Sequence, residues 1–322
     1  MSLSANKEEL TVQPRNSTIL TYPKQSSQQG PEISIDPAYK PLQAKLSLKF
    51  AEIDGTTRLV ERDHFGPLVV QKPFYPEGRE VCHVVIIHPP GGVVGGDQLE
   101  ILAQIGASAN AQITTPGATK WYKANGHTSQ QKIRLNINKG GSLEWVPQET
   151  IFYNHADVEI DHQVTLEEDA IYVGCEILCF GRTASGETFN SGQIKQRTSI
   201  RRNDKLIWLE QIRLLGESSA MSGSLALSGK TVCASLILTG KVIPQPLIDL
   251  AREEAEKITK GVGQVGISQL KSIVVARYLG DSSEVARHVM LCIWGLFRPE
   301  ILGRAGMVPN GEIRCTPGAP RG

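Results

Sequence analysis

One ten-residue segment constrains this chain more than any other, because few backbones can follow it. Residues 88–97 read HPPGGVVGGD and hold two prolines and four glycines. Proline presets φ, whereas glycine permits positive φ or the close approach of another chain. We therefore predict a shaped loop with the carboxylate of Asp97 at its exit. A second unusual segment, TPGATKWY, follows at residues 115–122.

The glycines do not form a phosphate-binding motif. A P-loop needs a Lys-Ser or Lys-Thr pair after its last glycine and a helix behind it. Here Gly96 is followed by Asp97, and residues 99–105, LEILAQI, are typical of a strand rather than of a helix. A dinucleotide fingerprint, which also needs a helix after the loop, is disfavoured for the same reason. A wide turn between two strands is the simpler alternative to a functional loop.

Composition narrows the class of protein. The 322 residues suffice for one large β domain or two ordinary ones, and the net charge of +1 favours neither nucleic acid nor an anionic membrane as a partner. No apolar run approaches the ~20 residues that span a bilayer. Residues 1–40 are polar and rich in Ser, Gln and Pro, without the apolar stretch of a signal peptide. We expect a disordered N-terminal extension on a cytoplasmic protein.

From Ala44 onward the dominant hydrophobic period is two, which is the period of a strand. Leu46, Leu48 and Phe50, for example, alternate with polar neighbours. Strand-like runs of this kind cover residues 46–50, 81–88, 133–137, 158–166, 171–180, 206–214, 232–238 and 273–278.

Two later segments have helical periodicity instead. Residues 246–260 begin with proline and are followed by Gly261, and residues 282–297 begin with a capping box and should stop before Pro299. We predict a mainly β fold, many-stranded and layered or solenoid-like, with two α-helices in the C-terminal third. A sheet stack, a barrel and a coiled solenoid all fit this pattern, and no clean repeat chooses among them.

Three polar residues occupy apolar positions of strands. Glu210 shares the parity of Leu206 and Ile212, Glu176 lies in a run that is apolar on both faces, and His162 follows Ile160 at the same parity. A buried carboxylate needs a cationic partner, a bound cation or water. Buried ion pairs with arginine are the alternative to a functional role, and for His162 a satisfied core histidine is favoured. The candidate partners are Arg134, Arg182, Arg197 and Arg213.

The six cysteines do not form a disulfide framework. Cys175 and Cys179 lie on one face of a predicted strand, about 13 Å apart at ~3.3 Å per residue, which is too far to share a metal ion. We expect both to pack in the core.

Carboxylates also flank the two unusual loops. Asp97 and Glu100 converge only if the glycine loop adds a bulge, and Glu149 follows Pro147, which confines its strand to an edge or a bend. Paired carboxylates would serve a glycoside hydrolase. This alternative, a carbohydrate-active enzyme using Asp97 and Glu149, lacks the sugar-stacking aromatic residues such an enzyme needs.

Taken in order, these segments resemble the urease accessory protein UreD (UreH) family from about residue 42 to residue 305. The resemblance rests on the loop at 88–97, PGATK at 116–120, LEWVPQETI at 143–151, GRTASGE at 181–187 and LFRP at 296–299. The loop at 88–97 and the PQE segment together are specific.

The resemblance implies a cytosolic, non-enzymatic chaperone that binds apo-urease and helps to load nickel, together with an F-type accessory protein and a G-type GTPase. It also implies that nickel, as a transported ion rather than a bound cofactor, passes through a polar internal tunnel. Asp97, Glu100 and Glu149 match the acidic positions of the motifs. The parity argument adds Glu176 and Glu210 as further transit candidates. Scattered carboxylates without a Cys/His cage give weak sites, which suit an ion that must be released.

Two departures from the family pattern set the expected domain limits. Residues 1–40 form a longer polar extension than the family has, and residues 306–322 do not follow its usual ending. We therefore expect a single domain over residues 41–305 and an irregular tail beyond it.

Overall fold

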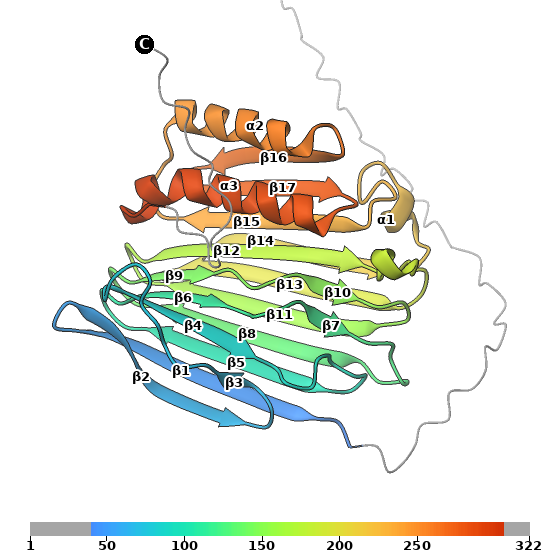
Figure 1. Ribbon diagram of the computed structural model, residues 1–322, viewed down its shortest axis with the longest axis horizontal. Helices are drawn as coiled ribbons and strands as arrows, with labels where there is room; N and C mark the ends of the chain where they lie inside the picture. The colour runs from blue at the N-terminus through green and yellow to red at the C-terminus, as the bar shows by residue number, and fades with distance from the viewer. Residues whose placement is uncertain (1–39, 306–322) are drawn as a thin grey trace, which may run out of the picture. The chain divides into compact units, whose positions relative to one another are not determined.

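The computed structural model describes residues 40–305. Within them the chain forms two sheets and passes from one sheet to the other almost strand by strand between β4 (Val81–Ile87) and β13 (Gln193–Arg202) (Figure 1). The predictions for residues 1–39 and 306–322 lie outside the described residues.

Seven described strands form the first sheet, in the spatial order β14 (Lys205–Leu215), β13, β11 (Asp157–Leu166), β8 (Ser129–Ile137), β5 (Gln98–Ile105), β1 (Gln43–Ile53) and β2 (Thr56–Phe65). Ten described strands form the second: β16 (Gly263–Leu270), β17 (Ile273–Gly280), β15 (Val232–Thr239), β12 (Ile171–Phe180), β9 (Ser142–Trp145), β6 (Asn110–Thr114), β4 and β3 (Val69–Val70), with β10 (Thr150–Phe152) beside β12 and β7 (Thr119–Trp121) beside β10.

The central strands of both sheets are parallel, which makes the fold solenoid-like. In the first sheet, residue 98 lies opposite residue 130, residue 129 opposite 158, and residue 157 opposite 193. The successive turns of the coil are unequal in length, which explains why the sequence carries no clean repeat. Antiparallel pairs close the coil, among them β1 with β2, β13 with β14 and β15 with β17. The mainly β, layered and solenoid-like prediction is confirmed.

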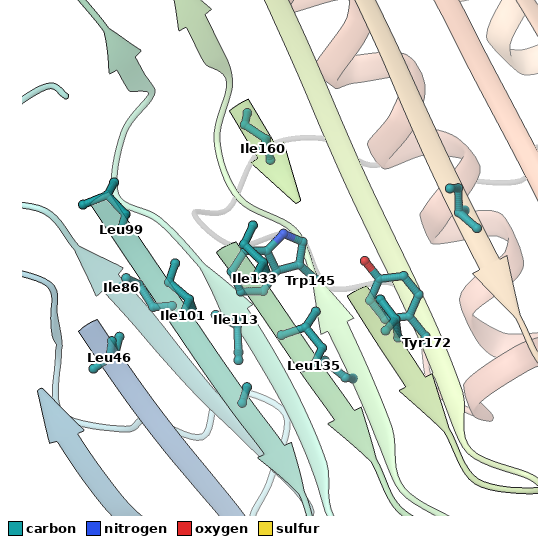
Figure 2. Close-up of a cluster of buried hydrophobic side chains, with 14 of the residues drawn as sticks. Leu46, Ile86, Leu99, Ile101, Ile113, Ile133, Leu135, Trp145, Ile160 and Tyr172 are labelled. Atoms are coloured by element: carbon teal, nitrogen blue, oxygen red, sulfur yellow. The ribbon is translucent and has the colours of Figure 1, made fainter. Parts of the chain in front are cut away.

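The main hydrophobic core fills the space between the two sheets. Inward side chains of both sheets are almost fully buried in it; Leu46 is 1% exposed and Leu135 is 0% exposed. Figure 2 shows residues of the first sheet, such as Ile101 and Ile133, next to Ile113 and Trp145 of the second. At about 25 cal/mol per Å² of buried apolar surface, this layer is the chief stabilising element of the fold.

A second core lies on the opposite face of β12, β15 and β17. There α3 (Ser283–Leu302) packs on the strands and α2 (Gln245–Thr259) packs on α3 and β16 (Figure 1). The two predicted helices are confirmed within a few residues. The N-cap of α3 is Ser282, whose Oγ accepts a hydrogen bond from Val285 N at 3.2 Å, so the cap starts one residue later than the predicted box of Asp281 and Glu284 and has a valine in place of the reciprocal glutamate. A third, short helix, α1 (Ser219–Ser222), was not predicted.

The prediction that the last helix stops before Pro299 was wrong. Pro299 lies inside α3, which ends at Gly303 with a left-handed φ of 67°. Proline in a helix interior costs about 3 kcal/mol because it removes a hydrogen bond and clashes with the preceding turn. The buried contacts of the neighbouring Arg298, described below, hold the final turn in place and offset that cost.

The outer face of the first sheet is unusual because parallel sheets are normally covered on both faces. Here a row of side chains in register crosses five strands with alternating charge, and Lys45 Nζ lies 3.2 Å from Glu100 Oε2. Cross-strand pairs of opposite charge stabilise a solvated sheet face and fix its register. The row consists of Lys45, Glu100, Lys132, Asp161 and Arg197.

Candidate functional site

Asp97 is a structural residue of the glycine-rich loop. Its side chain is buried, and its two oxygens accept hydrogen bonds from Leu42 N and Val94 N, each at 2.9 Å. The carboxylate therefore closes the turn at 94–97 and ties it to the start of β1. Asp97 and Glu100 do not converge, since Glu100 points outward into the charge row. Convergence was expected only if the glycine loop added a bulge.

Glu149 is held by the C-terminal helix. Its Oε1 accepts a hydrogen bond from Arg287 Nε at 2.9 Å, and both side chains are mostly buried. The ion pair fastens the segment after β9 to α3. Neither Asp97 nor Glu149 lines either of the two cavities described next, so the hydrolase alternative gains no support.

Two cavities lie next to each other between the sheets. Cavity 1, of about 300 Å³, is lined by His88, Gln131 and Trp145, among others. Cavity 2, of about 670 Å³, is lined by Glu210, Cys233 and Arg277, among others. Glu176 and Leu178 of β12 line both cavities. The carboxylate of Glu176 therefore lies where the two spaces meet.

Within residues 40–305, no arginine forms an ion pair with Glu176. Its Oε2 accepts a hydrogen bond from Gln196 Nε2 at 2.6 Å, and its Oε1 lies 3.3 Å from His162 Nδ1. The other ring nitrogen of His162 lies 3.4 Å from the Tyr172 hydroxyl, and His162 is 1% exposed, which confirms the satisfied core histidine. About a quarter of the Glu176 side chain is exposed, so the carboxylate borders open space rather than packed side chains.

Glu210 also faces inward, but it is neutralised. Its Oε1 lies 2.8 Å from Arg277 Nη1 of β17. Arg277 was not among the arginines expected from the sequence; Arg134 and Arg197 pair with Asp161 instead, and Arg182 pairs with Glu187. Parity thus placed Glu210 on the correct face, and Glu176 lies at an inward position of a strand that was expected to be covered on both faces. The arginines named as candidate partners of the two residues were wrong.

Sequence reasoning missed three polar residues that line cavity 1. Gln196 and Gln131 occupy inward positions of β13 and β8. Gln131 shares the parity of Ile133, Leu135 and Ile137, so a parity test could have found it, whereas the strand that holds Gln196 was not predicted. His88, in the first motif, also lines this cavity, and its buried Nε2 has no hydrogen-bond partner in the described part of the chain. Burial lowers the pKa of His88, an effect partly opposed by Asp97, so its imidazole is neutral near pH 7.

A second buried polar cluster was also missed, on the other face of the second sheet. Arg298 is fully buried and donates hydrogen bonds to Glu144 Oε1 at 2.9 Å and to Glu77 Oε1 at 2.8 Å, while Trp294 Nε1 donates to Glu144 at 2.7 Å. Burial raises the pKa of Glu77, but hydrogen bonds from His83 and Arg298 outweigh it and lower the pKa from 4.5 to about 2. This cluster joins α3 to β4 and β9.

The five cysteines in the described part of the chain are free thiols. Cys175 and Cys179 are free thiols in the second core, as predicted. Burial, with nearby Glu210 and Glu176, raises the pKa of Cys233 to about 12, so this thiol stays protonated beside cavity 2. Within residues 40–305, no group of three or more His, Cys, Asp or Glu side chains is placed to hold a metal ion. The five candidate carboxylates do not form one site.

Three of the motif segments, at 88–97, 116–120 and 143–151, contribute residues to the lining of cavity 1, and close backbone contacts join the first two. Val93 N donates to Lys120 O at 2.8 Å and Tyr122 N donates to Val93 O at 2.9 Å, so the glycine-rich loop extends β7 by one bridge. Gly92 faces the Tyr122 ring, and a Cβ atom at this position would lie 2.3 Å from Cε2 of that ring. A larger residue at this position would therefore displace the Tyr122 ring from its present place. Among the described helices, none is long and apolar enough to cross a bilayer.

Comparison with known proteins gives a consistent result. The profile of the family described as UreD urease accessory protein matches residues 42–312. The urease accessory protein UreD of Nitrosospira multiformis is 63% identical over 270 residues, covering 84% of this chain and 97% of that protein. The UreD proteins of a Janthinobacterium species and of Methylobacillus flagellatus are 55% and 42% identical, covering 83% and 85% of this chain and 90% and 95% of their own lengths. The chain belongs to the UreD family of urease accessory proteins.

Proposed function

We propose that this protein is a cytoplasmic, non-catalytic chaperone that binds apo-urease and conducts nickel toward the urease active site. In this role it acts with an F-type accessory protein and a G-type GTPase. Family membership supports a role in urease maturation. The nickel path is inferred from the cavities.

The observation that carries the proposal is the position of Glu176 between two cavities. Its partners there are an amide and an imidazole rather than an arginine, so its negative charge is not cancelled by a fixed cation. Nickel accepts oxygen and imidazole ligands, and His88 and Glu176 provide one of each along cavity 1. A single carboxylate binds a divalent ion weakly enough to release it.

The five candidate carboxylates take different roles under this proposal. Glu176 and Glu210 line the path, Glu210 with its charge held by Arg277. Asp97 and Glu149 shape the loop and its attachment to α3, and Glu100 stabilises the outer face of the first sheet. A nickel ion that passes through the two cavities would therefore meet Glu176 as its one carboxylate ligand, among the residues that the structure describes, without an arginine partner.

The test is Glu176→Gln, which keeps the shape of the side chain and removes its charge. We expect urease that matures with this variant to contain several-fold less nickel and to have proportionally lower activity, while copurification of the variant with urease is unchanged. Glu100→Gln, which removes the same charge from the outer face, serves as the matched control and should load urease normally. Full nickel loading with a Glu176→Gln, Glu210→Gln double variant would contradict the proposed path.

A further inference from the structure

The carboxyl ends of several parallel strands meet at one edge of the second sheet. At this carboxyl end of the strands, β7 and β10 continue the sheet beyond the last residues of β6 and β9 (Figure 1). The loop after β4 joins them through the bridge between Val93 and Trp121. The loops that follow these strands form a continuous surface. We call it the loop face, and define it as residues 88–97, 115–123, 153–155 and 181–187.

The loop face is held rigid by stacked side chains. The Tyr122 ring meets the Tyr153 ring edge-on at 4.9 Å between centroids, and the guanidinium of Arg182 lies 4.4 Å from the centroid of Tyr153. Glu187 anchors Arg182 with a hydrogen bond of 2.7 Å. Tyr122 in turn packs against Gly92. A surface fixed in advance loses little conformational entropy when a partner binds.

The chemistry of the loop face is apolar with a positive rim. Pro89, Pro90 and Pro116 are exposed, and Val94 is 38% exposed. Arg182 is neutralised by Glu187, but neither Lys120 nor Lys123 forms an ion pair with any residue in the described range. The charges complementary to the two lysines are therefore absent from this part of the chain.

The loop face also surrounds an opening of cavity 1. Gly91, Pro116 and Gly117 are exposed and line this cavity, and Lys120 lines it as well. Cavity 2 instead reaches the surface beside Leu225, Gln264 and Gly266, at the edges of β14 and β16. A protein bound to the loop face would cover the first opening and leave the second one free.

We propose that the loop face docks apo-urease through an acidic surface segment that meets Lys120 and Lys123, with the prolines packing against apolar side chains beside it. The proposal rests on the chaperone role given above and adds the surface, the charge of the partner and the end of the path that faces urease. Nickel that passes Glu176 would then leave cavity 1 directly into the bound enzyme.

The experiment measures binding of the full chain to purified nickel-free urease at several salt concentrations. Reversing both rim charges in Lys120→Glu, Lys123→Glu should raise the Kd about tenfold and flatten its dependence on salt. The matched control, Lys195→Glu and Lys205→Glu, makes the same charge change on exposed lysines of β13 and β14 and should bind as the wild type does. Unchanged affinity in the rim variant would overturn the proposal.

Two further measurements separate this proposal from its alternatives. If the rim variant keeps its affinity for urease but loses the F-type accessory protein, the loop face serves that partner and the proposal is overturned. Glu176→Gln should bind urease with wild-type affinity and fail in nickel loading. Normal loading in that variant, together with weak binding of the rim variant, would refute the nickel path and leave the docking surface intact.

Discussion

The space between the two sheets is closely packed with apolar side chains at one end and contains two cavities with several polar groups in their walls at the other, although the same parallel coil builds both. The inward residues Leu46 of β1, Ile105 of β5 and Leu135 of β8 are almost fully buried and line neither cavity, although other residues of β5 and β8 border cavity 1. Around β12 and β13 the inward residues include Glu176 and Gln196, which border the cavities. The first end stabilises the fold, and the second keeps a space open inside it into which a few polar side chains reach. Each prediction below tests this division of roles.

The largest effect should come from the apolar end. Leu135→Ala removes a fully buried side chain, and we expect a loss of about 3 kcal/mol in the free energy of unfolding, measured by urea denaturation. The control is Gln131→Ala on the same strand and the same face, which lines cavity 1 and should cost under about 1 kcal/mol. Equal losses in the two variants would show that the ends do not differ.

Lowering the pH should destabilise the protein through the buried cluster around Arg298. The pKa of Glu77 is lower in the folded protein than its ordinary 4.5, so its stabilising contribution is complete above pH 4.5 and declines as the pH falls toward 2. We expect about 2 kcal/mol of stability to be lost over that range. Urea midpoints measured between pH 2 and 6 test this. Glu77→Gln should be less stable at pH 6 and should show a weaker dependence on acid.

The charge row on the outer face should contribute less than either cluster. Asp161 accepts from Arg134 and also lies 3.5 Å from Arg197. Because these side chains are partly exposed, Asp161→Asn should cost about 1 kcal/mol in low salt and less in high salt. Thermal unfolding at two ionic strengths measures this difference, and an effect that does not depend on salt would speak against an electrostatic origin.

The smallest change in stability should come from the polar end. Glu176→Gln should alter the free energy of unfolding by under about 0.5 kcal/mol, because the new amide can still contact Gln196 and the site borders open space. Its effect on nickel loading should nevertheless be large. A strongly destabilised Glu176→Gln protein would place this residue among the structural ones and erase the contrast between the two ends.

Local pattern was sufficient for most of the strands and for the direction of key side chains. Period two located β1, β8 and β11, continuous apolar runs located β4 and β12, and parity placed Glu210 on the inward face. The period-two pattern did not reveal β13, because Gln196 and Thr198 occupy two of its inward positions and weaken the alternation. Parity depends only on neighbours in the sequence, which is why it succeeded where the pattern was regular.

Interactions between distant segments could not be read from the sequence. Asp97 receives a hydrogen bond from Leu42 N, 55 residues away, and Arg277 reaches Glu210 from the other sheet. Such partners depend on the register of the coil, which unequal turn lengths conceal. The extension of α3 beyond Pro299 has the same cause, since Arg298 meets Glu144 and Glu77 only in the folded protein.

The contact between Arg298 and Glu77 joins residues separated by 221 positions. During synthesis, the ribosome releases Glu77, His83 and Glu144 long before Arg298 emerges. Until then these side chains have no guanidinium between them, and β4 and β9 cannot bury that face against α3. Completion of the nascent domain therefore waits for its last helix, and a chain cut short before Arg298 would expose the unpaired acids to cellular quality control.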